Sequence, residues 1–287
     1  TVRSLYAEEL RYVDDATSHP HADRVNLWHD DVLAQASELY NFPFAFAIGN
    51  RQVAERILSS ASPDDFRCVV ADMERAGVGQ IALQALERDT AVLSGPPTML
   101  DLLPWPLSTP FPELNLVGGT SSTESIAIQL WESAPALRKN PTISAQWARY
   151  IPAAAAHEDL EVLRYDRIGL YTTAYVDLLA NMVTDGMADS FATAQTQLML
   201  SWDNVFSPQQ EQQIWQRIQP ELLKAGDRAQ QSAVMFGDAT QGFPPDTGYT
   251  IGFHIVQGYL ARHPGAAFST LAGLSTAAIF DGSGYTG

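Results

Sequence analysis

The stretch Tyr150–Asp166, YIPAAAAHEDLEVLRYD, decides how the rest of the chain is interpreted. Alanine is the best helix former, so this segment predicts a helix, with Pro152 in its first turn. His157 and Glu161 are four residues apart and therefore share one face of that helix. The segment thus presents an imidazole and a carboxylate side by side.

Glu158 follows His157 directly, which gives the pattern HExxE. In the related pattern HExxH, two ligands one turn apart hold zinc, and the carboxylate beside the first is the general base. Zinc accepts carboxylate oxygens at about 2.0–2.2 Å, so Glu161 can replace a histidine. This replacement hardens the site and shifts its preference towards metals such as manganese. A solvated acidic helix face is the alternative interpretation.

A second helix offers a third ligand. The segment TDGMADSF places Asp185 and Asp189 four residues apart on one helical face. Gly186 costs about 1 kcal/mol of helix stability relative to Ala, and it permits close packing or the approach of a metal. Apolar neighbours indicate partial burial, and a pair of exposed acids is the alternative.

Further elements surround these two helices. Residues 113–117 (ELNLV) and 125–131 (SIAIQLW) predict two strands joined by a Gly/Ser/Thr turn. The proline-rich segment 94–114 predicts an extended connector leading into the first of them. Ser207 and Pro208 begin a helix, and the run IGFHIVQGYL is helix-like.

The N-terminal part, residues 1–94, predicts several short helices. The first residues, TVRSLYAEEL, read as an amphipathic helix. Asn26 is the expected N-cap of a second helix. A third begins with Ser62 as its cap and Pro63 at its first position, and it ends at Gly77.

Four pieces, in this order, resemble the bacterial predicted zinc-dependent proteases, a domain family of unknown function with a gluzincin-type pattern. The resemblance covers about residues 95 to 265. It rests on VGGTSSTESIAIQLW, IPAAAAHEDLEVLR, LLANMVTDGMADSFA and TGYTIGFHIVQGYLARHP. The third piece matches the family's Glu-Gly-x-Ala-Glu as Asp-Gly-Met-Ala-Asp, and the fourth matches Gly-Tyr-x-Ile-Gly-Tyr with a final Phe253.

The resemblance implies a role for each matching residue. His157, Glu161 and Asp185 would be the metal ligands, with carboxylates at two positions where the family has His and Glu. Glu158 would be the general base. Arg164 and Asp189 would support the ligands.

Peptide hydrolysis also needs a donor for the oxyanion, and Tyr249 and His254 are the candidates. The alternatives are a packing role for Tyr249 and a hydrogen-bonded core position for His254.

The expected fold is α+β and mainly helical. The resemblance implies a gluzincin-like core, in which a small β-sheet packs on the helix of His157, together with a helical N-terminal part. We expect a helical region at 1–94 and a metallopeptidase-like domain at 95–287, forming one compact unit.

The composition restricts partners and compartment. The 287 residues carry a net charge of −16, which disfavours nucleic acid and anionic membranes. Cys68 is the single cysteine, so no intrachain disulfide forms. No apolar run is long enough for a membrane span. The first residues do not read as a signal peptide, which favours the cytoplasm, although a secreted or periplasmic protein could have lost its signal.

Two functions are consistent with this sequence. One is a metal-dependent peptidase or hydrolase that uses zinc, or manganese, to activate water for attack on a peptide or protein substrate. The other is a catalytically degenerate relative that needs no metal and acts as a binding or regulatory module. The sequence leaves the oligomeric state open.

Overall fold

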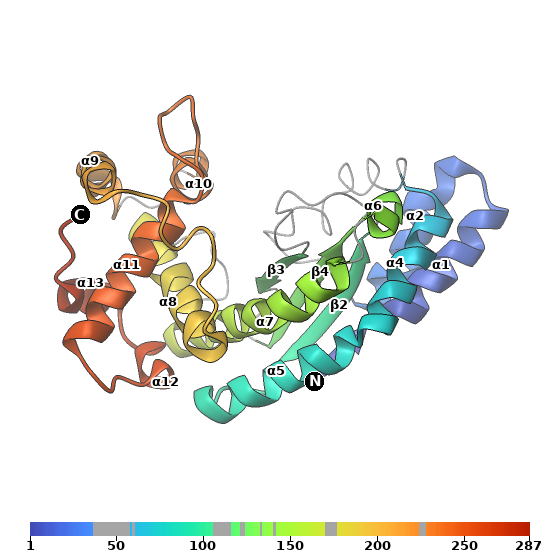
Figure 1. Cartoon of the computed structure of the whole chain (residues 1–287), viewed down its shortest axis with the longest axis horizontal. Coiled ribbons are helices and arrows are strands. Elements are labelled where there is room, and N and C mark those ends of the chain that lie inside the picture. Colours follow the sequence, from blue (N-terminus) through green and yellow to red (C-terminus); the bar gives the residue numbers. More distant parts are fainter. Residues whose placement is uncertain are drawn as a thin grey trace. The chain divides into compact units, whose positions relative to one another are not determined.

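The computed structural model describes residues 1–36, 58, 61–105, 116–120, 124–132, 134–139, 142–169, 177–223 and 228–287. It is mainly helical with one small mixed sheet, which confirms the α+β prediction (Figure 1). The chain divides into two compact units, one of Thr1–Ala91 with Pro96–Val162 and one of Val92–Gly95 with Leu163–Gly287. The gluzincin-like core and the division at 94/95 stay predictions.

The first unit contains the sheet and the N-terminal helices. Its strands are β1 (Val2–Ser4), β2 (Met99–Trp105), β3 (Leu116–Thr120) and β4 (Ser125–Trp131). Its helices are α1 (Tyr6–Ser18), α2 (Arg24–Asp31), α4 (Pro63–Ala76), most of α5 (Val78–Leu93), α6 (Ala134–Lys139) and most of α7 (Ile143–Ile168), with 3-10 turns at His21–Asp23 and Leu33–Gln35.

The sheet has the strand order β1-β2-β4-β3. Strands β1 and β4 run parallel to β2, and β3 pairs antiparallel with β4. The predicted strand 125–131 is confirmed, and so is its pairing with the preceding strand. Gly118 and Gly119 lie in β3 rather than in the turn where we placed them, opposite Ile128 and Ala127. Residues 113–115 of the predicted first strand lie outside the described residues.

Helices pack on both faces of this sheet. Leu103, Trp105 and Ala127 share one face and belong to an apolar core with Tyr12, Trp28 and other residues of the N-terminal helices. Side chains alternate along a strand, so Gly118 and Thr120 of β3 lie on the opposite face. That face meets α7, because the Thr120 hydroxyl donates to Glu158.

Two predictions for the N-terminal part and one for the proline-rich segment are wrong in detail. Val2–Ser4 form a strand, because they pair with β2, and the helix begins only at Tyr6. Helix α2 begins at Arg24 after Asp23, so Asn26 lies inside it. The proline-rich segment contains β2, and Pro104 is tolerated there because β1 ends opposite Leu102 and leaves it a neighbour on one side only.

The caps of α4 are confirmed. Ser62 and Asp65 form a capping box, Pro63 begins the helix, and Gly77 ends it in the left-handed conformation. These are local interactions within one turn of the chain, which is why the sequence predicts them.

The start of α7 differs from the prediction. The helix begins at Ile143, and Pro152 lies inside it. Proline removes one helical hydrogen bond, but Trp147, Ile151 and Ala155 are fully buried. We infer that their packing keeps the helix continuous across Pro152.

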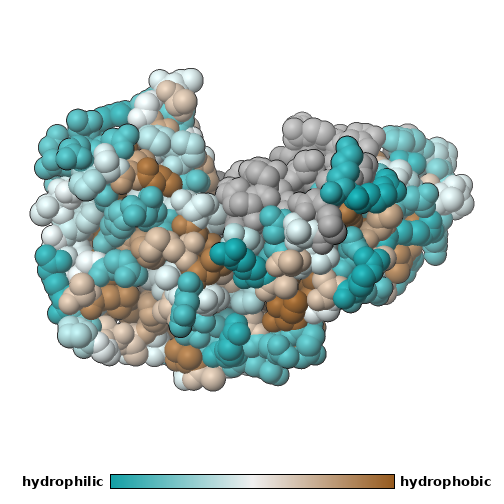
Figure 2. All heavy atoms as spheres, viewed as in Figure 1, coloured by the Kyte–Doolittle hydropathy of each residue, from teal (hydrophilic) through white to brown (hydrophobic). Residues whose placement is uncertain are grey.

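The second unit is helical among its described residues. It consists of the end of α7, then α8 (Leu178–Thr196), α9 (Pro208–Ile218), α10 (Arg228–Phe236), α11 (Thr247–Arg262), α12 (Phe268–Leu271) and α13 (Thr276–Ser283), with a 3-10 turn at Gln219–Glu221. Ser207 caps α9 and Pro208 begins it, as predicted. Hydrophilic side chains cover α9 (Figure 2), whereas Ile214 and Trp215 face inward. In the part of the chain that the structure describes, no helix combines the length and the apolar character that crossing a bilayer requires.

Candidate metal centre

Helix α7 places His157 and Glu161 one turn apart on one face. The His157 Nε2 atom lies 3.9 Å from Glu161 Oε1, and both side chains are mostly shielded from solvent. This spacing follows from the helical period, because residues four apart are neighbours on a helix surface. The alternative interpretation, a solvated acidic helix face, therefore does not describe this pair.

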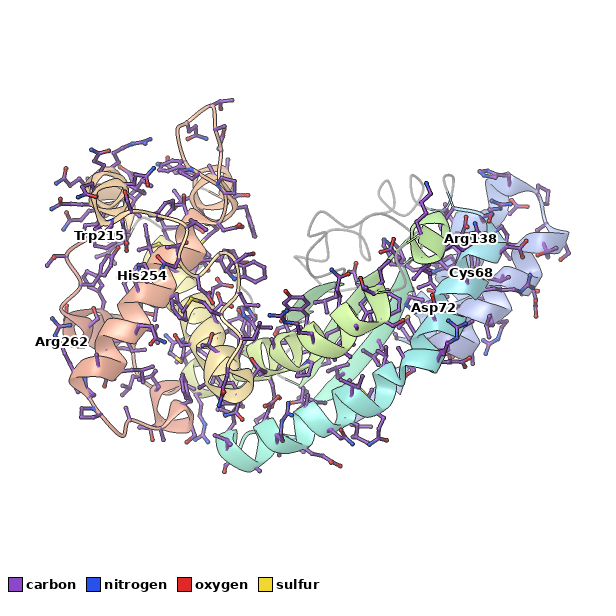
Figure 3. The ribbon with its side chains drawn as sticks, viewed as in Figure 1. Cys68, Asp72, Arg138, Trp215, His254 and Arg262 are labelled. Carbon is purple, nitrogen blue, oxygen red and sulfur yellow. The ribbon has the colours of Figure 1, made fainter. Side chains whose placement is uncertain are left out.

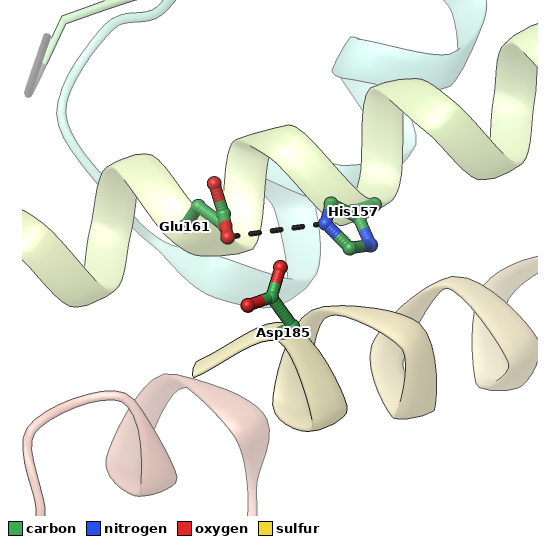
Figure 4. Close-up of side chains that lie close together, drawn as sticks. All are labelled: His157, Glu161 and Asp185. Atoms are coloured by element: carbon green, nitrogen blue, oxygen red, sulfur yellow. Dashed lines mark ion pairs between the residues drawn. The ribbon is translucent and has the colours of Figure 1, made fainter. Parts of the chain in front are cut away.

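Asp185, near the middle of α8, directs its carboxylate towards the same pair (Figure 4). One ligand atom from each of His157, Glu161 and Asp185 lies within 4.8 Å of the other two. No other group of three or more His, Cys, Asp or Glu among the described residues has this arrangement. The three predicted ligands thus form one cluster.

Arg164 holds the end of α7 against α8 close to this cluster. Its Nε donates to Thr184 Oγ1 at 3.2 Å, and Thr184 is the neighbour of Asp185. Its other nitrogens donate to the Ala272 and Leu274 carbonyls and to Thr276 Oγ1. Burial lowers the pKa of Arg164 to about 10. Arg164 thus joins α7 to α8, and the support that we expected it to give the ligands stays a prediction.

The side chain of Glu158 points to the sheet and contacts strand β3. The Thr120 hydroxyl lies 2.9 Å from Glu158 Oε2 and 3.2 Å from the Glu158 main-chain oxygen. Glu158 is 5% exposed, so this hydrogen bond is sheltered from water. The carboxylate next to His157 is thus held in a defined position.

Asp189 is fully buried one turn after Asp185. Its Oδ2 accepts a hydrogen bond from Trp202 Nε1 at 3.1 Å. It lies outside the three-residue cluster, so the support that we expected it to give the ligands stays a prediction.

The two candidate donors for the oxyanion both lie on α11. The ring of Tyr249 contacts those of Trp202 and Phe236 edge-on or tilted. His254 is labelled on α11 in Figure 3. Its Nδ1 atom lies 2.7 Å from Glu211 Oε1 on α9. Burial raises the pKa of Glu211, but the hydrogen bonds from His254 and Tyr285 outweigh it and lower that pKa.

Sequence reasoning did not identify Thr120 and Gly118 as residues of this site, because it placed them in a turn. The available signal is their spacing. Two residues apart in a strand, they must share one face of the sheet, and here that face carries Glu158.

The donor set fits a divalent cation. Tetrahedral zinc with bonds of about 2.0–2.2 Å would separate its ligand atoms by about 3.4 Å. The donors of the cluster lie within 4.8 Å of one another. Modest side-chain rotations would therefore bring all three within bonding distance of one ion. One imidazole and two carboxylates suit zinc, and their oxygens also suit manganese.

Fold and donor set together define a mainly helical α+β protein with a candidate site for a divalent metal. The family described as predicted Zn-dependent protease (DUF2268) matches residues 137–280, half of the chain, and the chain belongs to this family. The match includes α7, α8 and α11, whereas the β3–β4 hairpin precedes it. No curated protein and no solved structure matches the chain.

Proposed function

We propose that this protein is a metal-dependent peptidase in which His157, Glu161 and Asp185 bind the metal and Glu158 is the general base. The observation that carries the proposal is the convergence of these three ligands from α7 and α8. Membership of the family of predicted Zn-dependent proteases supports it.

Each residue then has a chemical task. A bound divalent cation would acidify a water molecule and polarise the peptide carbonyl. Glu158, directly after His157, accepts the proton of that water and later delivers it to the departing amine. The Glu158 carboxylate accepts a hydrogen bond from the Thr120 hydroxyl.

Tyr249 is the better of the two candidate donors to the oxyanion. Gly252 packs against Met182 of α8, the helix that carries Asp185. His254 is two residues beyond Gly252 and points to nearly the opposite side of α11, where Glu211 accepts from it. Tyr249 is three residues before Gly252 and lies nearer the side that faces α8.

We propose zinc as the metal, with manganese as a competitor. The family description supports zinc. Two carboxylates to one imidazole give an oxygen-rich site, which weakens the advantage that zinc has with nitrogen and sulfur ligands. A peptide or protein is the proposed substrate.

The test combines metal analysis with a variant of the base. The purified chain, supplemented with zinc or manganese, should retain about one equivalent of metal, and His157→Ala should lose it. Cleavage of fluorescently labelled denatured casein should fall by about 10²–10⁴-fold in Glu158→Gln. Asp166→Asn, which changes an exposed acid on the same helix, is the matched control and should cleave normally.

The outcomes separate the two functions. Metal binding with cleavage that depends on Glu158 supports the peptidase. No bound metal and no cleavage after supplementation would indicate a catalytically degenerate relative that acts by binding. Full cleavage by Glu158→Gln would show that another group is the base.

A further inference from the structure

We propose that Thr120 of β3 is a positioning residue for the general base, and that Gly118 leaves the space in which the Glu158 carboxylate is held. This inference rests on the proposed function, because it assigns Glu158 the role of base. It adds the edge strand β3 to the site, which lies before the segment that the family match covers.

The hydroxyl of Thr120 fixes one end of the carboxylate. It has a single proton, and the nearer of its two acceptors is Glu158 Oε2, at 2.9 Å against 3.2 Å for the main-chain oxygen. Hydrogen bonds to a charged acceptor are the stronger ones, so the proton is directed to Oε2. Both acceptors belong to Glu158, which ties the side chain and the helix backbone to the same strand.

The glycine at 118 removes an obstacle on the same face of the strand. A Cβ atom at this position would lie 2.5 Å from Glu158 Oε1 and 3.2 Å from Cδ and Cγ. These contacts are closer than van der Waals packing allows. Any other residue at 118 would therefore displace the carboxylate that Thr120 holds.

Strand β3 itself is held in register. Five residues of β3 pair with β4, including Gly118 with Ile128 and Thr120 with Ile126. Both partners on β4 are fully buried. The two contacts to Glu158 thus come from a sheet and not from a loop, which favours precise positioning.

Positioning of this kind has a characteristic effect on a reaction. A displacement of about 1 Å in a reacting group can cost about 100-fold in rate. The loss falls on kcat, because Glu158 acts in proton transfer and does not hold the substrate. A residue with only a structural role would instead lower stability and leave kcat per folded molecule unchanged.

The experiment compares Thr120→Val, which keeps the shape and loses the donor, with Thr120→Ser, which keeps the donor. Crystal structures of both variants and of the wild type should show the Glu158 carboxylate moved in the first and unmoved in the second. On an internally quenched peptide selected from casein cleavage sites, Thr120→Val should lower kcat by about 10–100-fold, with KM and bound zinc little changed. Thr120→Ser should stay within about threefold of the wild type.

The outcomes distinguish this inference from the proposed function. If the wild-type protein cleaves no peptide, the proposed function fails, while the crystal structures still decide whether Thr120 places Glu158. A Thr120→Val variant that keeps the wild-type carboxylate position overturns the positioning role, as does a Thr120→Ser variant that is as impaired as Thr120→Val. If Thr120→Val is poorly folded, Gly118→Ala gives the second reading, because it displaces the same carboxylate with the donor present.

Discussion

Gly186 of α8 and Gly252 of α11 lie backbone against backbone. A Cβ atom on Gly186 would overlap the carbonyl group of Gly252, and a Cβ atom on Gly252 would overlap the carbonyl oxygen of Met182. The two helices therefore approach each other more closely than any side chain at these positions allows. Asp185 directly precedes Gly186, so this contact also sets the position of a proposed metal ligand.

Gly252→Ala should destabilise the protein by about 1–3 kcal/mol or more, because the new methyl group meets backbone that cannot move aside. Urea unfolding followed by circular dichroism measures the change. Gly273→Ala is the matched control in the same unit, since its nearest neighbour would lie at an ordinary 3.6 Å. Equal stability of the two variants would contradict the close approach.

Asp89 of α5 makes stability depend on pH. It is fully buried, and neither of its carboxylate oxygens has a hydrogen-bond partner among the residues that the structure describes. Burial, and then the charge of Asp159, raise the pKa of Asp89 to about 7, whereas an unfolded Asp titrates near 3.9. Between about pH 4 and 7 the folded state holds a proton that the unfolded chain has lost. The free energy of unfolding therefore falls as the pH rises through this window and levels off above it.

Asp89→Asn removes this dependence. Relative to the wild type, the variant should gain roughly 2–3 kcal/mol of unfolding free energy between pH 5 and pH 8. Urea unfolding at both pH values measures the gain. Glu87→Gln, an exposed acid on the same helix, should show no such gain. A variant that is less stable than the wild type at pH 8 would argue that Asp89 carries a needed charge.

The fold could be predicted from the sequence where its causes are local. The capping box of Ser62, the proline after Ser207 and the left-handed Gly77 each act within one turn of a helix. The prediction that Pro152 lies in the first turn of its helix is wrong, because packing of residues far apart in sequence overrides the local preference of proline for a helix start. Strand β1 was missed for the same reason, since three residues form a strand only because β2 lies beside them.

Only those parts of the candidate site that depend on spacing within a single helix could be predicted from the sequence. The spacing of His157 and Glu161 follows from the helical period. The same period made Asp185 and Asp189 candidates on the next helix, and the resemblance singled out Asp185. The hydroxyl of Thr120 reaches Glu158 across 38 residues of sequence, a contact that depends on how the sheet packs. Tertiary structure alone likewise brings His254 and Tyr285 to Glu211.

Tyr285→Phe should weaken the contact between the C-terminal segment and α9. The Tyr285 hydroxyl donates to Glu211 Oε1 at 2.5 Å, and its ring packs edge-on against Trp215. The variant keeps the ring and loses a hydrogen bond to a charged acceptor, which costs about 1.5–3 kcal/mol at pH 7. Urea unfolding measures the loss, and Tyr259→Phe, whose ring stacks on His263, should change stability by less than about 0.5 kcal/mol.

The hydrogen bond between Tyr285 and Glu211 also predicts how stability changes in acid. The pKa of Glu211 is lowered, because the hydrogen bonds from His254 and Tyr285 outweigh its burial. The stability that the Glu211 carboxylate contributes is therefore present at neutral pH and is lost as the pH falls through its lowered pKa. The gap between wild type and Tyr285→Phe should narrow in acid, and a gap that widens would contradict this assignment.

Glu161→His tests the ligand set directly, because it changes one carboxylate to the imidazole of the HExxH pattern. Nitrogen ligands favour zinc over manganese more strongly than carboxylates do. The ratio of zinc to manganese affinity, measured by competition with a chelator of known affinity, should therefore rise in the variant. Asp166→Asn should leave the ratio unchanged, since Asp166 is exposed on the same helix. An unchanged ratio in Glu161→His would mean that Glu161 does not contact the metal, and the pairing with His157 would then serve only to hold the helix face.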